Sequence, residues 1–370
     1  MEPLLNKDLI KSGCVYSEYR TDDARLTIEI LKTATKHNAL PINYIEITDL
    51  IYKKGKVCGA KYIDRLTDIC GRISAKHTIN ASGPWVDHIR KKDNSLKGKR
   101  IHHTKGVHLV VSKDKLPVNH ALYFDAFDGR MIFAIPRGKI TYFGTTDTNY
   151  NEALESPNTS HDDVIYLLKA INTMFPSHSI NKEDISSSWA GIRPLIHQKG
   201  KDPSEISRKD EIFESNSGLL SIAGGKLTGY RKMAKRIIDK LSIALSKDGK
   251  ELLPCQTESI PLGQKIEKVS EFIGKVHNLI ATKNLHPYTA EYLVRTYGTD
   301  AMNIARLSIE TKNSNNHISL GIAELHHCME KESIHKLTDF FVQRTGRLYF
   351  DIESINELID PICEEMGHML

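Results

Sequence analysis

The residues with the clearest capacity for chemistry lie around Gly224-Gly225-Lys226. The apolar run from Leu219 to Ala223 is typical of a short buried strand, and apolar residues at helical spacing follow Lys226. A strand, two glycines and a helix start bring free backbone N–H groups and a lysine to one place, where the helix dipole adds positive charge. Such a site suits an anion or an electron-rich ring edge. A glycine pair alone is equally typical of a tight turn.

Further polar motifs lie at the ends of apolar runs elsewhere in the chain. They are Asn80-Ala81-Ser82-Gly83, Lys105-Gly106-Val107-His108, Gly144-Thr145-Thr146-Asp147, the segment Ser188 to Leu195 with Arg193, and Ser207-Arg208-Lys209-Asp210. In this order and at these distances the set resembles the FAD-dependent glycerol-3-phosphate dehydrogenases, the respiratory type of bacteria and mitochondria. The resemblance extends from Tyr19 to Arg347.

The resemblance implies a D-amino-acid-oxidase-like FAD flavoprotein fold, of the α+β or α/β class. We expect a mixed-sheet substrate and flavin-cap domain, with a remnant of the FAD-binding domain, over residues 1–250. Pro254, Pro261 and Gly263 indicate a linker over 251–264. The helical patterning that follows predicts an all-helical C-terminal domain over 265–370.

The pattern of apolar residues predicts the elements that position these motifs. We expect a helix from about Asp22 to His37, with Thr21 or Asp22 as its N-cap. A second helix is expected over 161–174. Predicted strands cover 42–52, 57–64, 75–80, 107–111, 121–127, 131–136, 140–144, 185–189 and 219–223, with hairpin turns at 53–55 and 128–129.

One expected unit is missing from the sequence. No G-x-G-x-x-G motif occurs, and no opening strand–helix unit that would carry it. In the family this unit begins the protein and holds the ADP part of FAD. The chain is therefore expected to be an excised fragment, inactive alone, with a naturally split protein as the alternative.

For the phosphate of the substrate, the resemblance implies Arg193 and Arg208. Arginine suits this role because its planar fork donates two parallel hydrogen bonds to phosphate oxygens. Pro194 is expected to end regular structure and so fix the direction of Arg193. A surface arginine in an ion pair is the ordinary alternative for each.

For the catalytic base, the resemblance implies His108, which interrupts an otherwise apolar strand. A neutral imidazole near pH 7 can accept the proton of the C2 hydroxyl while hydride leaves. A core histidine bonded to backbone is the alternative reading, and His102 and His103 compete for the role.

The flavin is expected to lie against three segments. Lys226 is implied as a catalytic, substrate-binding or flavin-binding cation, because positive charge beside the pyrimidine edge favours the anionic reduced ring. Asn80 to Gly83 is similar to the second FAD signature of two-dinucleotide flavoproteins, with serine in place of threonine. Gly144 to Asp147 is interpreted as a structural turn. The expected cofactor-binding residues are Asn80, Ala81, Ser82, Gly83, Thr104, Lys105, Gly106, Gly224, Gly225, Lys226, Leu227 and Thr228.

The amino-acid composition of the chain limits the kinds of ligand and partner that we expect. The net charge of +5 fits an anionic substrate or membrane surface, while the short basic runs lack the aromatic residues of a nucleic-acid surface. The six cysteines form no C-x-x-C pair, which predicts reduced thiols. His326, His327 and Cys328 meet no zinc spacing, so no metal is expected.

The resemblance further implies glycerol 3-phosphate as substrate and membrane quinone as electron acceptor. It places the intact enzyme in the cytoplasm, peripheral to the inner face of the cell membrane, with a homodimer left open. The nearest alternative is an oxidase that passes electrons to oxygen and makes hydrogen peroxide. Such oxidases typically carry an insertion between the arginine segments, whereas only 196–206 separate them here, which favours the dehydrogenase. A non-catalytic scaffold is the alternative from another class.

Overall fold

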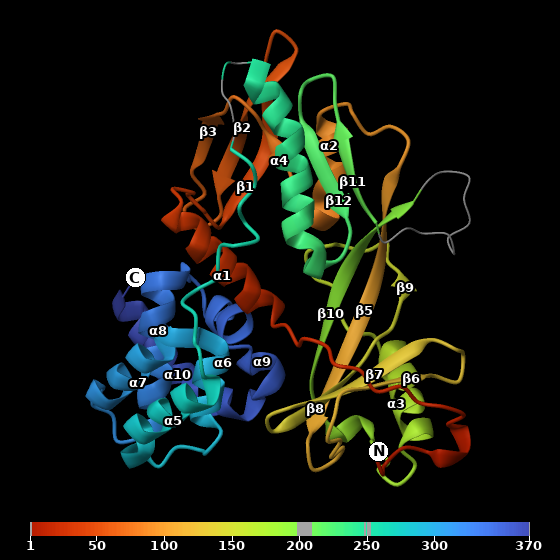
Figure 1. Cartoon of the computed structure of the whole chain (residues 1–370), viewed down its shortest axis with the longest axis vertical. Helices are drawn as coiled ribbons and strands as arrows, with labels where there is room; N and C mark the ends of the chain where they lie inside the picture. Colours follow the sequence, from red (N-terminus) through yellow and green to blue (C-terminus); the bar gives the residue numbers. More distant parts are fainter. Residues whose placement is uncertain (1, 198–208, 248, 250–252, 370) are drawn as a thin grey trace.

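A pair of long antiparallel strands runs through the middle of the molecule (Figure 1). These are β5 (Arg100–Ser112) and β10 (Ile185–His197), paired from Val111↔Ile185 to Arg100↔His197 with one shift of register between Ile185 and Ser187. They belong to a six-stranded sheet of order β10-β5-β8-β7-β6, in which β9 also pairs with β5. The other strands are β6 (Leu122–Asp125), β7 (Met131–Arg137), β8 (Ile140–Gly144) and β9 (Thr148–Asn149).

One face of this sheet is a core and the other carries polar and aromatic side chains. Val107, Leu109 and Val111 of β5 are fully buried against Leu167 and Ile171 of α3 (His161–Met174). Ser160 caps α3 with a capping box, which sets where the helix begins. Because side chains alternate along a strand, the even-numbered residues of β5 face away from α3.

Two three-stranded sheets form the end of the molecule that lies away from α3 (Figure 1). Strands β11 (Asp210–Glu214), β12 (Leu220–Gly224) and β4 (Ile79–Asn80) form one, with β4 parallel to β12. Strands β1 (Ile45–Lys53), β2 (Lys56–Asp64) and β3 (Cys70–Ser74) form the other. Helices α2 (Val86–Lys92) and α4 (Tyr230–Lys247) pack on β12, α2 through Val86 and α4 through Ile237.

The residues after Val269 that the structure describes form helices around their own core. They are α5 (Val269–Ile280), α6 (Thr289–Tyr297), α7 (Ala301–Glu310), α8 (Asn316–Glu332), α9 (Arg347–Phe350) and α10 (Ile352–Met369), with a π-helical turn at Asp339–Arg344. Short 3₁₀ turns lie at Lys7–Leu9, Gly83–Trp85, Lys182–Asp184, Leu227–Gly229, Ala281–Lys283 and Gly298–Asp300. Leu293, Ile304, Leu325, Phe340 and Ile362 are among the buried residues of this core.

Helix α1 (Asp23–Lys36) connects the part of the fold that contains the sheets with the C-terminal helices. Asp22 caps it, as predicted, by accepting a hydrogen bond from the Arg25 backbone N–H. The Arg25 side chain forms two hydrogen bonds of 2.6 and 2.8 Å with Glu332 at the end of α8. The guanidinium is 6% exposed and the carboxylate is fully buried, so this ion pair lies in the interior.

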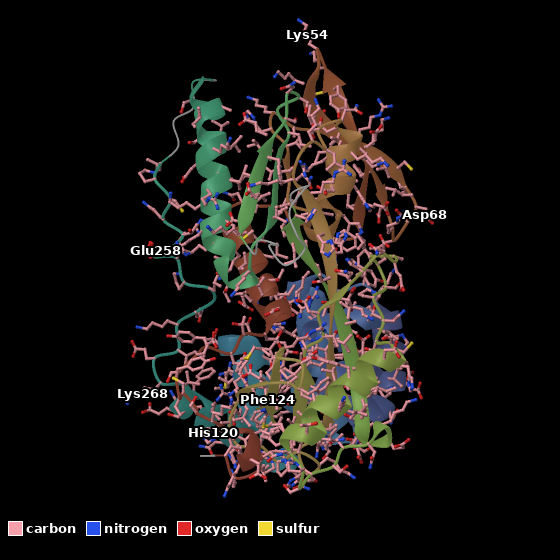
Figure 2. All side chains as sticks on the ribbon, turned by 90° about the vertical axis from the view of Figure 1, so that its right-hand side faces the viewer. Lys54, Asp68, His120, Phe124, Glu258 and Lys268 are labelled. Carbon is pink, nitrogen blue, oxygen red and sulfur yellow. The ribbon has the colours of Figure 1, made fainter. Side chains whose placement is uncertain are left out.

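This computed structural model describes residues 2–197, 209–247, 249 and 253–369. Figure 2 shows the elongated outline, with Lys54, in the β1–β2 turn, at one end and His120 near the other. Within the described ranges, no helix combines the length and the apolar character that are needed to cross a bilayer.

Several predicted elements differ from those observed. The strand predicted over 185–189 is the first part of the 13-residue β10, and Pro194 lies inside it, opposite His103, instead of ending it. The predicted strand 75–80 is reduced to Ile79–Asn80. The helix predicted to open at Lys226 starts with a 3₁₀ turn, with Lys226 as N-cap. The domain bounds 1–250, 251–264 and 265–370 stay a prediction.

Candidate active site

His108 lies on the polar face of β5, directly opposite Trp189 of β10. The two rings stack with centroids 4.7 Å apart and planes inclined by 18°, and Phe133 of β7 lies 5.3 Å away. Burial, together with the positive charge of Arg193, lowers the pKa of His108 to about 4. Its Nδ1 is buried and has no hydrogen-bond partner among the residues that the structure describes. The imidazole is therefore neutral near pH 7, with one buried nitrogen left available for a ligand.

Arg193 lies on the same face, four residues beyond Trp189 on β10 and opposite Thr104. Its Nη2 donates a 2.9 Å hydrogen bond to Thr145 Oγ1, and its Nη1 donates one of 3.2 Å to the Thr146 carbonyl. The side chain stays 30% exposed. The predicted phosphate ligand and the predicted base are thus brought together, with one exposed edge for a substrate.

Glycine at position 106 makes room for Arg193. A Cβ built on Gly106 would lie 2.3 Å from Nη2 of Arg193, so the guanidinium lies directly on the backbone of β5. Thr104, two residues before, is buried, and its Oγ1 has no hydrogen-bond partner in the structure. Gly106 and Thr104 therefore share the face of His108.

The structure separates Lys105 from that face. Its Nζ donates hydrogen bonds to Asp163 (2.6 Å) and to the Asn158 carbonyl (3.0 Å), on the side of α3. The ion pair also holds the pKa of Asp163 below its usual range, against the effect of burial. The ammonium of Lys105, predicted to bind the cofactor, is not brought to the face of His108, because neighbouring residues of a strand point to opposite sides.

His102 and His103 have other partners. The Nε2 atom of His102 lies 2.8 Å from Asn149 Oδ1, and that of His103 lies 2.8 Å from the Pro84 carbonyl. His102 thus contacts β9, and its ring centroid also lies 6.2 Å from that of His197 at the end of β10, whereas His103 contacts the Gly83–Trp85 turn. Neither ring is stacked on Trp189 as His108 is.

The segment Gly144 to Asp147 was missed by the sequence analysis, which interpreted it as a structural turn. It follows β8, whose last residue, Gly144, pairs with His108. Thr145, Thr146 and Asp147 then contact Arg193, the last through an ion pair of 3.5 Å. Two threonines and an aspartate directly after an apolar strand were the available signal.

The glycine pair lies at the carboxyl end of β12. Gly224 and Gly225 have φ of +77° and +78°, which side chains other than glycine rarely adopt. Lys226 is exposed, and Leu227 and Thr228 form the 3₁₀ turn that leads into α4. The first N–H groups of a helix have no partner within it, so this turn presents donors and a cation to its surroundings.

The turn Asn80 to Gly83 lies at the same edge. Strand β4 ends at Asn80 and is parallel to β12, so both carboxyl ends meet at one sheet edge, which is where open α/β sheets bind ligands. Asn80 Nδ2 donates to the Val86 carbonyl (2.9 Å) and to Ser221 Oγ (3.1 Å), and its Oδ1 accepts from Ser82 Oγ (2.6 Å). Asn80 shapes the turn, while Ala81 and Ser82 are exposed.

Strand β10 connects the surroundings of Arg193 with the glycine pair at the end of β12. A Cβ on Gly224 would lie 2.8 Å from the Ile196 side chain, and Ile196 follows Arg193 by three positions in β10. At about 3.3 Å per residue the two positions are roughly 10 Å apart along the strand. Arg208, the second predicted phosphate ligand, lies outside the described residues.

The histidines of α8 belong to structural contacts. His326 Nε2 lies 2.5 Å from a carboxylate oxygen of Glu365, and Cys328 is fully buried. Among the residues that the structure describes, no group of three or more His, Cys, Asp and Glu side chains is arranged to hold a metal ion.

Models of two known protein families match the chain. A model of the family described as "FAD dependent oxidoreductase" matches residues 1–231, and one described as "C-terminal domain of alpha-glycerophosphate oxidase" matches residues 255–370. The chain belongs to the FAD-dependent oxidoreductases. The predicted resemblance and the predicted fold class are confirmed.

Three relatives within this family cover nearly the whole chain. The aerobic glycerol-3-phosphate dehydrogenase of Bacillus subtilis (strain 168) is 47% identical over 376 residues, 99% of this chain and 67% of that protein. The enzyme of the same name from Staphylococcus aureus (strain USA300) is 44% identical over 379 residues, 100% of this chain and 68% of that protein. The X-ray structure of the Bacillus halodurans glycerol-3-phosphate dehydrogenase complexed with FAD has a TM-score of 0.89 at 41% identity, and the match covers 99% of this chain and 73% of that one.

The residues of this FAD-dependent oxidoreductase fit the ring portion of the cofactor. Two glycines with positive φ bring the backbone of the β12–α4 turn close to any ligand, and Lys226 adds a cation. Nδ1 of His108 and Oγ1 of Thr104, which have no hydrogen-bond partner among the described residues, provide buried polar atoms on the face of His108. The phosphate-binding G-x-G-x-x-G motif does not occur in the sequence.

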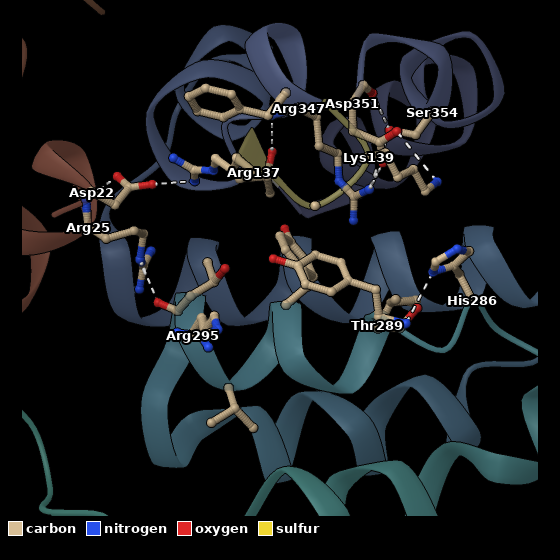
Figure 3. A pocket seen from close by; sticks show the side chains of 18 of the residues that line it. Asp22, Arg25, Arg137, Lys139, His286, Thr289, Arg295, Arg347, Asp351 and Ser354 are labelled. Atoms are coloured by element: carbon tan, nitrogen blue, oxygen red, sulfur yellow. Dashed lines mark hydrogen bonds and ion pairs between the residues drawn. The ribbon is translucent and has the colours of Figure 1, made fainter. Parts of the chain in front are cut away.

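A cavity of about 750 Å³ lies elsewhere in the oxidoreductase, between the start of α1, the β7–β8 turn and the C-terminal helices (Figure 3). Its cations are paired with acids: Arg137 with Asp22 at 2.7 Å, Arg347 with Asp351 at 3.5 Å, and Lys139 with Asp351 at 3.9 Å. These pairs connect the sheet and α1 with the helices, and they leave the cavity without a clear excess of either charge.

Proposed function

We propose that the chain carries the substrate-binding and flavin-edge portion of an enzyme that oxidises sn-glycerol 3-phosphate to dihydroxyacetone phosphate with FAD. The observation that carries the proposal is the placement of Arg193 and His108 on one face of the β5–β10 pair. The names of the relatives that match the whole chain support the same substrate.

The roles follow from the chemistry of the residues. Arg193 binds the phosphate through charge-assisted hydrogen bonds. His108, neutral because of its lowered pKa, accepts the proton of the C2 hydroxyl, while the hydrogen on C2 departs with its electron pair. Bound FAD supplies the hydride acceptor. Lys226 and the N–H groups of the following turn stabilise negative charge at the ring edge.

The first test is a titration of the purified chain with FAD, followed by the visible absorption and fluorescence of the flavin. We expect weak, saturable binding through the ring portion, because the sequence lacks a motif for the ADP portion. Loss of saturation on replacing Lys226 would support the proposed ring site. Binding that is indifferent to the Gly224–Thr228 turn would contradict it.

We further propose that the chain alone does not turn over and needs a dinucleotide-binding segment for activity. Assays of glycerol 3-phosphate oxidation with FAD and an artificial dye test this, with Arg193→Ala as the control. Turnover by the chain above that control would refute the requirement. A chain that binds neither FAD nor glycerol 3-phosphate would instead favour a non-catalytic scaffold.

For the electron acceptor we propose membrane quinone, with the intact enzyme peripheral to the inner face of the cell membrane. The short separation of 196–206 between the two arginine segments supports a dehydrogenase over an oxidase. The net charge of +5 suits an anionic surface. In a protein that also contains a dinucleotide-binding segment, quinone reduction without oxygen consumption is expected, and peroxide formation at a comparable rate would indicate the oxidase.

A further inference from the structure

Arg193 needs support to act as a fixed ligand. An arginine side chain loses rotamer entropy when it becomes ordered, so a mobile guanidinium binds a phosphate less tightly than one that is already held in place. In this structure its two terminal nitrogens already have acceptors, Thr145 Oγ1 at 2.9 Å and the Thr146 carbonyl at 3.2 Å. The guanidinium is therefore held in one orientation before any ligand arrives.

Thr145 is arranged as an acceptor for this purpose. Its hydroxyl donates its own proton to the Thr146 carbonyl at 3.1 Å, so its lone pairs point toward Arg193. The same carbonyl receives Nη1 of Arg193, which closes a small ring of hydrogen bonds. A serine at this position could make the same contacts, whereas an isosteric valine could make none of them.

The neighbouring residues fix this segment to the strand that carries His108. The Val107 backbone N–H donates to Thr146 Oγ1 at 3.0 Å. Gly144 lies against the imidazole, where an added Cβ would be 2.6 Å from Cδ2 of His108. The segment thus contacts the predicted base at one end and the predicted phosphate ligand at the other.

We propose that Thr145 is a positioning residue, which holds the guanidinium of Arg193 over Gly106 at a fixed place relative to His108. This inference rests on the proposed function for its meaning in catalysis. Its physical content, the restraint of Arg193 by Thr145, can be measured without substrate.

The experiment uses the full chain, isotopically labelled, with three threonine variants and Arg193→Lys. Thr145→Val removes the acceptor, Thr145→Ser restores it, and Thr148→Val is the matched control on β9, where the side chain is exposed. Two properties are followed by NMR without ligand: the rotation of the Arg193 guanidinium and the titration of the His108 imidazole. Isothermal titration calorimetry then gives the affinity for sn-glycerol 3-phosphate, with glycerol as the phosphate-free comparison.

In Thr145→Val we expect faster rotation of the guanidinium and an upward shift of the His108 titration, because the positive charge of Arg193 is no longer held nearby. Loss of one charge-assisted hydrogen bond should weaken binding of glycerol 3-phosphate roughly tenfold. Thr145→Ser should restore all three properties, and Thr148→Val should change none. If Thr145 had only a structural role, Thr145→Val would not shift the His108 titration without also changing the circular dichroism spectrum.

The outcomes distinguish the positioning role of Thr145 from the phosphate-binding role of Arg193. If Thr145→Val leaves the guanidinium rotation and the His108 titration at their wild-type values, the positioning role is wrong. If those two properties shift as expected but Arg193→Lys binds glycerol 3-phosphate as tightly as the wild type does, the restraint is real and the phosphate assignment of Arg193 in the proposed function is wrong.

Discussion

At the scale of single residues, His108 shows how surroundings define chemistry. An isolated histidine titrates near pH 6.5, but burial between Trp189 and Phe133 and the charge of Arg193 lower the pKa of His108 to about 4. The residue is thereby kept in the form that accepts a proton over the whole physiological range. The same shift has a consequence for stability.

The folded state binds the proton of His108 less readily than the unfolded state does, so its neutral form contributes stability above about pH 6.5. This contribution is lost as the pH falls from 6.5 toward 4, and amounts to roughly 3 kcal/mol at about 1.4 kcal/mol for each pKa unit. We therefore expect the difference in unfolding free energy between the wild type and His108→Gln to fall between pH 7 and pH 4. Urea unfolding at both pH values measures it, and a difference independent of pH would contradict the assigned environment.

Gly106 provides a second prediction at this scale. In Gly106→Ala the new methyl group occupies the place of the Arg193 guanidinium, which is the far end of a flexible side chain and can move aside. The fold should persist, with a Tm close to that of the wild type, while affinity for glycerol 3-phosphate falls about tenfold. Gly191→Ala is the matched control, because Gly191 pairs with Gly106 and an added Cβ there meets no atom within 4 Å.

At the scale of elements, the chemistry depends on where helices and strands end. Lys226 is the N-cap of the turn leading into α4, so its charge and the unpaired N–H groups of the turn act at the same place. Lys226→Met should weaken FAD binding several-fold. Lys232→Met removes an exposed charge one turn later and should leave the affinity unchanged. Flavin fluorescence titrations compare the two, and equal losses would indicate a general charge effect only.

The sequence was sufficient for elements whose signals are local. The N-cap of α1 at Asp22, the bounds of α3 and the turn at residues 53–55 follow from capping residues and apolar periodicity, and each is found as predicted. The extent of β10 was not predictable in this way. Its Pro194 is tolerated because β10 is the edge strand of the sheet, and its only ladder partner within that sheet, β5, comes from a distant part of the sequence.

The same distinction between local signals and long-range pairing applies to the candidate site. Arg193, His108 and Lys226 were named from a family resemblance, which carries residue identity but not orientation. The register of β5 against β10 decides that Lys105 points to Asp163 and that Gly106 lies under Arg193. Thr145 was missed because its role exists only once β8 and β10 are brought together around β5.

At the scale of the whole molecule, the helical part contacts the sheets through aromatic packing and hydrogen bonds near the candidate site. Tyr349 and Phe350 of α9 pack on Trp189, with ring centroids 5.2 and 5.5 Å away, so the helices support the indole that covers His108. Ser187 Oγ donates a 2.6 Å hydrogen bond to the Tyr349 carbonyl. On the other side, α1 is fastened to α8 by the ion pair of Arg25 and Glu332.

Breaking that ion pair should weaken the whole fold. Arg25→Met leaves the buried Glu332 carboxylate without its two shortest hydrogen bonds, a change that costs about 3 kcal/mol for buried pairs. The exposed pair of Lys268 and Glu271 is the control, and Lys268→Met should cost well under 1 kcal/mol. Denaturant unfolding measures both, and equal effects would mean that the buried pair does not hold α1 and α8 together.

The long pairing of β5 with β10 also sets the order in which the chain can assemble. The nearest paired residues, Val111 and Ile185, are 74 positions apart, and the intervening chain forms β6 to β9 and α3. Closing so large a loop is slow, because its entropy is lost before the contacts form. We therefore expect the face that carries His108 and Arg193 to form after the local elements of the intervening chain, β6 to β8 and α3. An anionic substrate or a flavin cannot template the early steps, and can only capture the chain once β10 has docked.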